Sequence, residues 1–123
     1  MEKKILVVDD NRLSREINCS TLDGAGYKTI MASDGNEGLN LLRSGKIDLI
    51  ILDLIMPGLD GFGFLSVCKT DPLTKDIPVI VITGRDSPEE VKMVKDLGAS
   101  ECLVKHRMPP VVFLKSVKTA LGC

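Results

Sequence analysis

The chain has 123 residues, of which 44% are hydrophobic and 27% are charged, a composition typical of one folded domain and incompatible with intrinsic disorder. Sixteen basic and seventeen acidic side chains give a net charge of −1, which argues against a strongly basic nucleic-acid-binding protein. No apolar run approaches the roughly 20 residues that a membrane-spanning helix needs.

Short apolar runs alternate with helical stretches along the chain. The runs predict strands buried between helices, and three of them consist almost entirely of Ile, Leu and Val. The predicted strands are Ile5–Val8, Thr29–Met31, Leu49–Leu52, Val79–Ile82 and Cys102–Val104. The predicted helices span residues 12–22, 34–43, 63–69, 87–97 and 109–121. This alternation predicts an α/β domain with a parallel sheet and right-handed crossovers.

Local signals mark several of the helices. Leu13 and Ile17, spaced i, i+4, indicate the first one. Asp34 followed by Glu37 is typical of a capping box at the start of the second. Before the fourth helix, Ser87 is a typical N-cap residue and the proline after it suits the first helical position. The last helix ends close to the C-terminus, so we expect no output domain within this chain.

The N-terminus and the cysteines indicate a cytoplasmic protein. Only four apolar residues, Ile5–Val8, precede the first aspartates, which is too short a run for a secretory signal. The cysteines are widely spaced and form no CxxC pair, so we expect reduced thiols. They are Cys19, Cys68, Cys102 and Cys123. The lone His106 builds no metal site with them at any familiar spacing.

Polar side chains follow four of the predicted strands directly. Asp9 and Asp10 follow the first, Asp53 the third, Thr83 the fourth and Lys105 the fifth. Taken singly, each suits an ordinary strand end or a helix cap. Because ligands of open parallel sheets bind beyond the carboxyl ends of the strands, the set together predicts a binding site at that edge.

The chemistry of this set points to a metal ion and a phosphoryl group. Clustered carboxylates repel one another, and a hard divalent cation relieves that repulsion. Mg²⁺ is typically held by one or two carboxylates together with phosphate oxygens, so we expect Mg²⁺ (or Mn²⁺) here. The neighbouring amine of Lys105 and hydroxyl of Thr83 predict a phosphoryl group beside the ion.

The stretches ILVVDD, LIILDLIMPGLDG, VIVITG and ECLVK occur in an order and spacing that resembles the receiver domain of two-component response regulators. The resemblance covers essentially the whole chain, so we expect one receiver domain over residues 1–123. It implies a stand-alone, chemotaxis-regulator-like protein. It also implies a flavodoxin-like three-layer sandwich, with five helices around a five-stranded parallel sheet of strand order 2-1-3-4-5.

The resemblance implies a role for each site residue. Asp53 matches the phosphoacceptor, which takes a phosphoryl group from the phosphohistidine of a sensor histidine kinase or a phosphotransfer protein. Asp10 matches the direct metal ligand and Asp9 a ligand acting through water. Asp53 and the backbone carbonyl of Ile55 complete the metal site. Lys105 matches the lysine that pairs with the phosphoryl oxygens.

Signalling roles follow from the same resemblance. Thr83 matches the switch hydroxyl that moves toward the phosphoryl group. The face formed by Ser87–Leu121 is implied to contact a downstream protein, with no nucleic acid and no membrane bound by this domain. The chain is then a phosphoacceptor that assists its own phosphorylation and dephosphorylation, not an enzyme that turns over a substrate.

Two residues depart from the family pattern. Cys102 stands where the family usually has an aromatic residue that swings inward as the threonine moves. His106 stands where the family usually has a proline after the lysine, so we expect this loop in the trans form. These changes affect the output switch more than the phosphorylation site.

Of three alternatives, one remains open and two lack a residue pattern that they need. A pseudo-receiver would act as an interaction module without phosphorylation, which Cys102 and His106 would permit. A haloacid-dehalogenase-type phosphatase needs an acid two residues after its nucleophile, where this chain has Ile55. A flavin or dinucleotide binder needs a Gly- or Ser/Thr-rich phosphate loop after the first strand, where this chain has Asp9 and Asp10.

Overall fold

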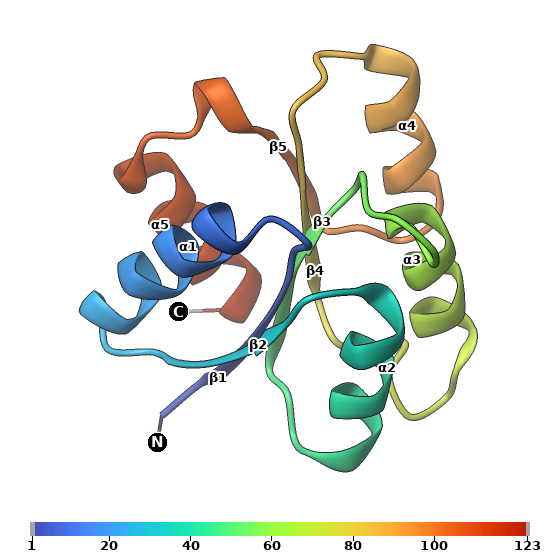
Figure 1. Cartoon of the computed structure of the whole chain (residues 1–123), viewed down its shortest axis with the longest axis horizontal. Coiled ribbons are helices and arrows are strands. Elements are labelled where there is room, and N and C mark those ends of the chain that lie inside the picture. The colour runs from blue at the N-terminus through green and yellow to red at the C-terminus, as the bar shows by residue number, and fades with distance from the viewer. Residues whose placement is uncertain (1, 123) are drawn as a thin grey trace.

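The fold is a parallel sheet covered by helices on both faces (Figure 1). The computed structural model describes residues 2–122, and the expectations that involve Met1 or Cys123 lie outside them. Its elements in chain order are β1 (Lys4–Val8), α1 (Arg12–Gly24), β2 (Lys28–Ala32), α2 (Gly35–Ser44), β3 (Leu49–Asp53), α3 (Gly61–Thr70), β4 (Val79–Thr83), α4 (Pro88–Asp96), β5 (Glu101–Val104), the 3₁₀ turn η1 (Lys105–Arg107) and α5 (Pro110–Leu121).

The strand order is β2-β1-β3-β4-β5, and every neighbouring pair is parallel. Helices α1 and α5 lie on one face of the sheet, and α2, α3 and α4 lie on the other (Figure 1). The expected flavodoxin-like sandwich of five strands and five helices is therefore confirmed. Among the described helices, none combines the length and the apolar character needed to cross a membrane.

The sheet separates two hydrophobic cores. Phe64 is fully buried in the core under α2, α3 and α4, and Phe113 is almost fully buried in the core under α1 and α5. Every residue of β3 and β4 is buried, which explains their unbroken apolar runs. Cys19, Cys68 and Cys102 are free thiols, as expected, and burial raises the pKa of each.

The predicted helix starts are present with their caps. The Asp34 carboxylate accepts a hydrogen bond from the backbone N–H of Glu37 at 2.8 Å, and the Glu37 carboxylate accepts one from the N–H of Ser33 at 2.7 Å. The Ser87 hydroxyl accepts a hydrogen bond from the N–H of Glu90 at 3.3 Å. These bonds satisfy backbone donors that the first turn of a helix leaves open.

Other expectations needed adjustment. Helix α3 begins at Gly61, two residues earlier than predicted, because the Asp60 carboxylate caps it through the N–H of Gly63. Leu13 and Ile17 lie on α1 as predicted, but they are 67% and 55% exposed and do not reach the core. The chain after β5 forms the turn η1, which the sequence did not predict, and the described residues contain no cis peptide bond.

Gly61 fixes the loop between β3 and α3, because no larger residue fits its position. A Cβ atom there would lie 2.6 Å from Cα of Leu54 and 2.9 Å from the carbonyl oxygen of Asp53. We expect Gly61→Ala to lower the free energy of unfolding by about 1–3 kcal/mol, since backbone atoms cannot yield as a flexible side chain can. Urea denaturation followed by circular dichroism measures this loss.

The matched control is Gly24→Ala at the end of α1, where an added Cβ would meet nothing within 4 Å. This substitution should be neutral or should stabilise the helix by up to about 1 kcal/mol. Equal effects of the two substitutions would contradict the packing of Gly61 described above.

Candidate functional site

The parallel register brings the ends of four strands to one edge of the sheet. Val8, the last residue of β1, pairs with Leu52 of β3, and Thr83, the last residue of β4, pairs with Val104 of β5. The polar residues at or just after these ends are therefore neighbours. Asp53 and Thr83 are themselves the last residues of their strands.

Three of these residues form a carboxylate cluster. Asp9, Asp10 and Asp53 each place a carboxylate oxygen within 4.8 Å of the others. Asp9 is 3% exposed and Asp53 is 6% exposed, whereas Asp10 lies at the surface. Two buried like charges beside a third are unfavourable without a compensating cation.

Asp9 is held in place by the start of α1. Its carboxylate accepts a hydrogen bond from the N–H of Asn11 at 2.9 Å, and its carbonyl accepts one from the guanidinium of Arg15 at 2.7 Å. Asn11 in turn caps α1, because its side chain accepts the N–H of Ser14 at 2.9 Å. The loop after β1 is thus tied to the helix that follows it.

The pKa of the Asp53 carboxyl is raised from its ordinary 3.8 to about 7, mainly by burial. The nearby charge of Asp9 and a hydrogen bond with its side chain contribute in the same direction. The Lys105 ammonium, 3.8 Å from Oδ2 of Asp53, and the N–H of Ile55, 3.4 Å from Oδ1, act in the opposite direction. Repulsion and burial outweigh this partial compensation.

A polar pocket of about 520 Å³ opens over the cluster. It is lined by Asp10, Asn11, Asp53, Ile55, Gly84, Arg85 and Lys105. Thr83 directly precedes Gly84 of this lining and is fully buried, and its hydroxyl accepts a hydrogen bond from the N–H of Arg85 at 3.1 Å. Thr83 is not among the residues that line the pocket.

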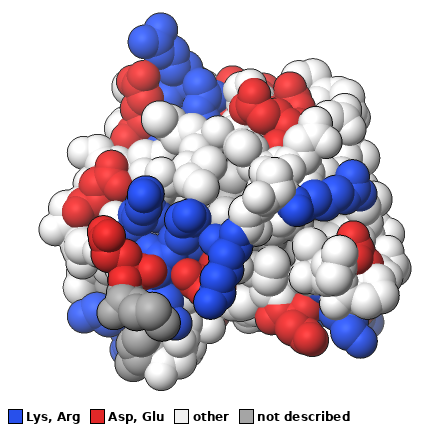
Figure 2. All heavy atoms as spheres, turned by 90° about the horizontal axis from the view of Figure 1, so that it is seen from below, with Lys and Arg blue, Asp and Glu red and all other residues white. Residues whose placement is uncertain are grey.

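The donor set fits a hard divalent cation. Carboxylate oxygens are the ligands that Mg²⁺ prefers, and a 2+ charge among these three side chains would offset the repulsion that raises the pKa of Asp53. The opposite end of the molecule differs in character. Figure 2 shows basic and acidic side chains interspersed there, and Lys3, Lys4 and Lys46 line a pocket together with Glu2 and Asp48.

The sequence did not reveal every residue of the site. Asn11 lines the pocket and Arg15 holds the backbone of Asp9, yet neither stands at the end of a strand. The position of Asn11, directly before an amphipathic helix, is a recognisable N-cap signal. The contact of Arg15 has no comparable signal, because an arginine on a helix is ordinarily a solvated surface residue.

Comparison with known proteins agrees with this geometry. The sequence profile of the response regulator receiver domain matches residues 5–115. The response regulator MprA of Mycolicibacterium vanbaalenii is 42% identical over 106 residues, which are 85% of this chain and 45% of that protein. The phosphate regulon transcriptional regulatory protein PhoB of Klebsiella pneumoniae is 34% identical over 89% of this chain and 48% of that protein.

Among solved structures, the chemotaxis protein CheY4 of Vibrio cholerae superposes with a TM-score of 0.92 at 34% identity, covering 98% of this chain and 100% of that one. The chain belongs to the response regulator receiver domain family. It spans about half the length of the curated relatives MprA and PhoB.

The carboxylate cluster makes a prediction about stability. In buffer with EDTA at pH 8, we expect Asp53→Asn to raise the free energy of unfolding by about 2–4 kcal/mol, because the amide removes one buried charge from the cluster. Thermal unfolding measures this gain.

The gain should depend on pH in a defined direction. When folding raises the pKa of a carboxyl, the free energy of unfolding is lowered in full above the folded pKa, here about 7. This loss disappears as the pH falls toward the ordinary pKa of 3.8. The advantage of Asp53→Asn should therefore shrink between pH 8 and pH 4. Asp76→Asn, at an exposed aspartate, is the matched control and should change little. A destabilised Asp53→Asn variant at pH 8 would contradict the repulsion described above.

Proposed function

We propose that this receiver domain accepts a phosphoryl group on Asp53 from the phosphohistidine of a sensor histidine kinase or a phosphotransfer protein, in a reaction that depends on Mg²⁺ (or Mn²⁺). One observation carries the proposal: a nearly buried aspartate lies at the carboxyl edge of the sheet, within reach of two further carboxylates and a lysine. Without a cation, the repulsion among these carboxylates is unfavourable. A divalent cation bound together with the transferred phosphoryl group would relieve it.

In the proposed transfer, an Asp53 carboxylate oxygen attacks the phosphorus. The bond from phosphorus to the histidine nitrogen breaks, and that nitrogen keeps the electron pair. Lys105 stabilises charge on the phosphoryl oxygens, since its ammonium already lies 3.8 Å from Oδ2 of Asp53. The carboxylates of Asp9, Asp10 and Asp53 and the carbonyl of Ile55 would hold the metal ion, which supplies charge neutralisation when bound.

Phosphorylation is proposed to signal through the loop after β4. Thr83 is buried beside the pocket, and its hydroxyl moves toward the phosphoryl group when it gives up its bond to the N–H of Arg85. A downstream protein then contacts the Ser87–Leu121 face. We place this signalling in the cytoplasm, without substrate turnover and without nucleic acid or membrane bound by the domain itself.

A pseudo-receiver is the second candidate, and Cys102 is the observation that favours it. This residue pairs with Val81 in the sheet and packs against the core beneath α4, with no ring to fill space vacated by Thr83. His106 lies exposed in η1. The carboxylate cluster distinguishes the two candidates. It lowers the stability of the fold, and a domain that is never phosphorylated gains nothing in return.

The proposal is tested by Mg²⁺-dependent phosphorylation with acetyl phosphate, detected by intact-protein mass spectrometry. We expect one phosphoryl group per chain in the wild type and none on Asp53→Asn, because the amide is close in shape but is no nucleophile. Asp76→Asn should be modified like the wild type. Stoichiometric modification of Asp53→Asn, or none of the wild type, would overturn the proposal.

A second expectation concerns the lifetime of the phosphoryl group. Ile55 is 43% exposed in the pocket and offers no side-chain hydrogen bond to hold an attacking water, while Arg85 pairs with Glu90 at 3.3 Å. We therefore expect slow self-dephosphorylation. Ile55→Asn should accelerate decay by roughly tenfold, which corresponds to about 1.4 kcal/mol in the barrier.

Decay is followed by the same mass measurement after the donor is removed, with Mg²⁺ in excess. Ile55→Val, which stays apolar, is the matched control and should decay like the wild type. An unchanged or slower decay of Ile55→Asn would show that Ile55 does not control the access of water.

A further inference from the structure

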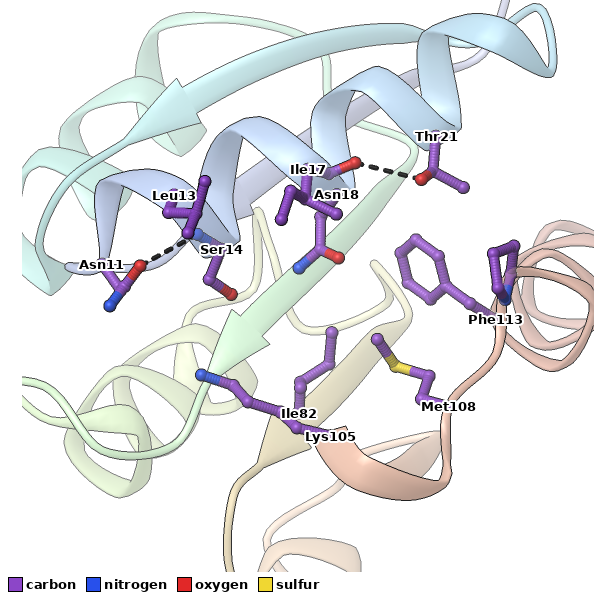
Figure 3. A pocket seen from close by; sticks show the side chains of 11 residues that line it. Asn11, Leu13, Ser14, Ile17, Asn18, Thr21, Ile82, Lys105, Met108 and Phe113 are labelled. Atoms are coloured by element: carbon purple, nitrogen blue, oxygen red, sulfur yellow. Dashed lines mark hydrogen bonds between the residues drawn. The ribbon is translucent and has the colours of Figure 1, made fainter.

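Another pocket, of about 390 Å³, lies between α1 and α5, next to the proposed phosphoacceptor site (Figure 3). This volume is within the range typical of small-molecule sites, roughly 300–1,000 Å³. Its apolar walls are formed by Leu13, Ile17, Ile82, Met108, Pro110 and Phe113. Its polar groups come from Asn11, Ser14, Asn18, Thr21 and Lys105.

Asn18 is the unusual feature of this pocket. It is only 7% exposed, yet its side-chain amide makes no hydrogen bond with any residue that the structure describes. Figure 3 shows the amide projecting from α1 into the space between Ile82, Met108 and Phe113. No fully buried side-chain nitrogen or oxygen of the described residues lacks a partner, so the Asn18 amide is open to water from the pocket. A bound molecule that offers the amide a complementary group would replace that water.

The exposed apolar residues of α1 belong to the same feature. Leu13 and Ile17 are more than half exposed, although apolar residues at this spacing ordinarily face a core. In this structure they form one wall of the pocket, opposite Met108, which precedes α5, and Phe113, which lies on α5. The walls therefore offer apolar contact on two sides of the Asn18 amide.

We infer that this pocket binds a neutral aromatic molecule that carries one hydroxyl group. A phenolic hydroxyl both donates and accepts a hydrogen bond, as the Asn18 amide does. The thioether of Met108 and the ring of Phe113 favour an aromatic body. An ionised group beside Asn18 would be buried without a counter-charge, which excludes a charged ligand at that end.

The pocket shares a wall with the phosphoacceptor site. Asn11 and Lys105 line both pockets, and the Lys105 ammonium lies 3.8 Å from Asp53. A ligand against the aliphatic stem of Lys105 restricts that side chain and favours its contact with a phosphoryl group on Asp53. Occupancy of the pocket and phosphorylation are thus coupled positively, an inference that rests on the proposed function, and by linkage the coupling acts in both directions.

The ligand site is tested with p-cresol and with toluene, which lacks only the hydroxyl, by NMR titration in EDTA without phosphodonor. In the wild type, p-cresol should give saturable shifts at the Asn18 side-chain amide and the Met108 methyl group. Its affinity should exceed that of toluene by about 3- to 10-fold, the effect of one hydrogen bond. Asn18→Leu should abolish this preference, while Asn40→Leu on the exposed side of α2 should preserve it.

A second variant tests the pocket from an exposed position, where a substitution is less able to disturb the fold than one at the buried Asn18. Ile17→Trp narrows the pocket from a position that is 55% exposed and should weaken both probes alike. Shifts that do not saturate, shifts centred outside the pocket, or a p-cresol preference retained by Asn18→Leu would overturn the ligand site.

The coupling is tested by repeating the p-cresol titration with Mg²⁺ and beryllofluoride, a phosphoryl mimic. The affinity of the wild type should rise at least about twofold, a shift of about 0.4 kcal/mol. Equal affinities would refute the coupling and leave the ligand site standing. If beryllofluoride itself fails to shift the Ile55 amide, the proposed function falls together with the coupling, whereas p-cresol binding in EDTA still decides the ligand site.

Discussion

The repulsion among three carboxylates at one edge of the sheet is the constraint on which this molecule depends. Asp9, Asp10 and Asp53 lie within 4.8 Å of one another, and two of them are nearly buried. The fold supports this unfavourable cluster with two hydrophobic cores on either side of the sheet and with backbone bonds around Asp9. The result is a site whose energy falls when positive charge arrives, which is the property that a magnesium-dependent phosphoacceptor needs.

Much of this arrangement could be predicted from the sequence, because continuous apolar runs identify buried parallel strands and such strands end at a common edge. The position of Asp53 and the Ser87 cap of α4 followed from these local rules. The burial of Thr83 did not, since a residue at a strand end is as often exposed. Likewise, the spacing of Leu13 and Ile17 indicates a helix but not whether another element covers that face. Whether these side chains are buried depends on contacts between segments that are distant in the sequence.

Lys105 lines both the polar pocket over the carboxylate cluster and the apolar pocket between α1 and α5. On one side its ammonium faces Asp53, and on the other its side chain lines the apolar pocket between α1 and α5. Cys102, three residues earlier, stands where the resemblance to receiver domains implies an aromatic ring. The ligand inferred to bind beside Asn18 would act on Lys105 directly, and through it on the phosphoryl group proposed for Asp53.

The most direct test of the account is the effect of Mg²⁺ on thermal stability. If the carboxylates form a cation site, Mg²⁺ should raise the free energy of unfolding well above the effect of NaCl at equal ionic strength. The expected gain is about 2.7 kcal/mol at a hundredfold excess over the dissociation constant. Asp10→Ala should require a much higher Mg²⁺ concentration for the same gain. Equal stabilisation by Mg²⁺ and NaCl would contradict the central claim that these carboxylates bind a divalent cation.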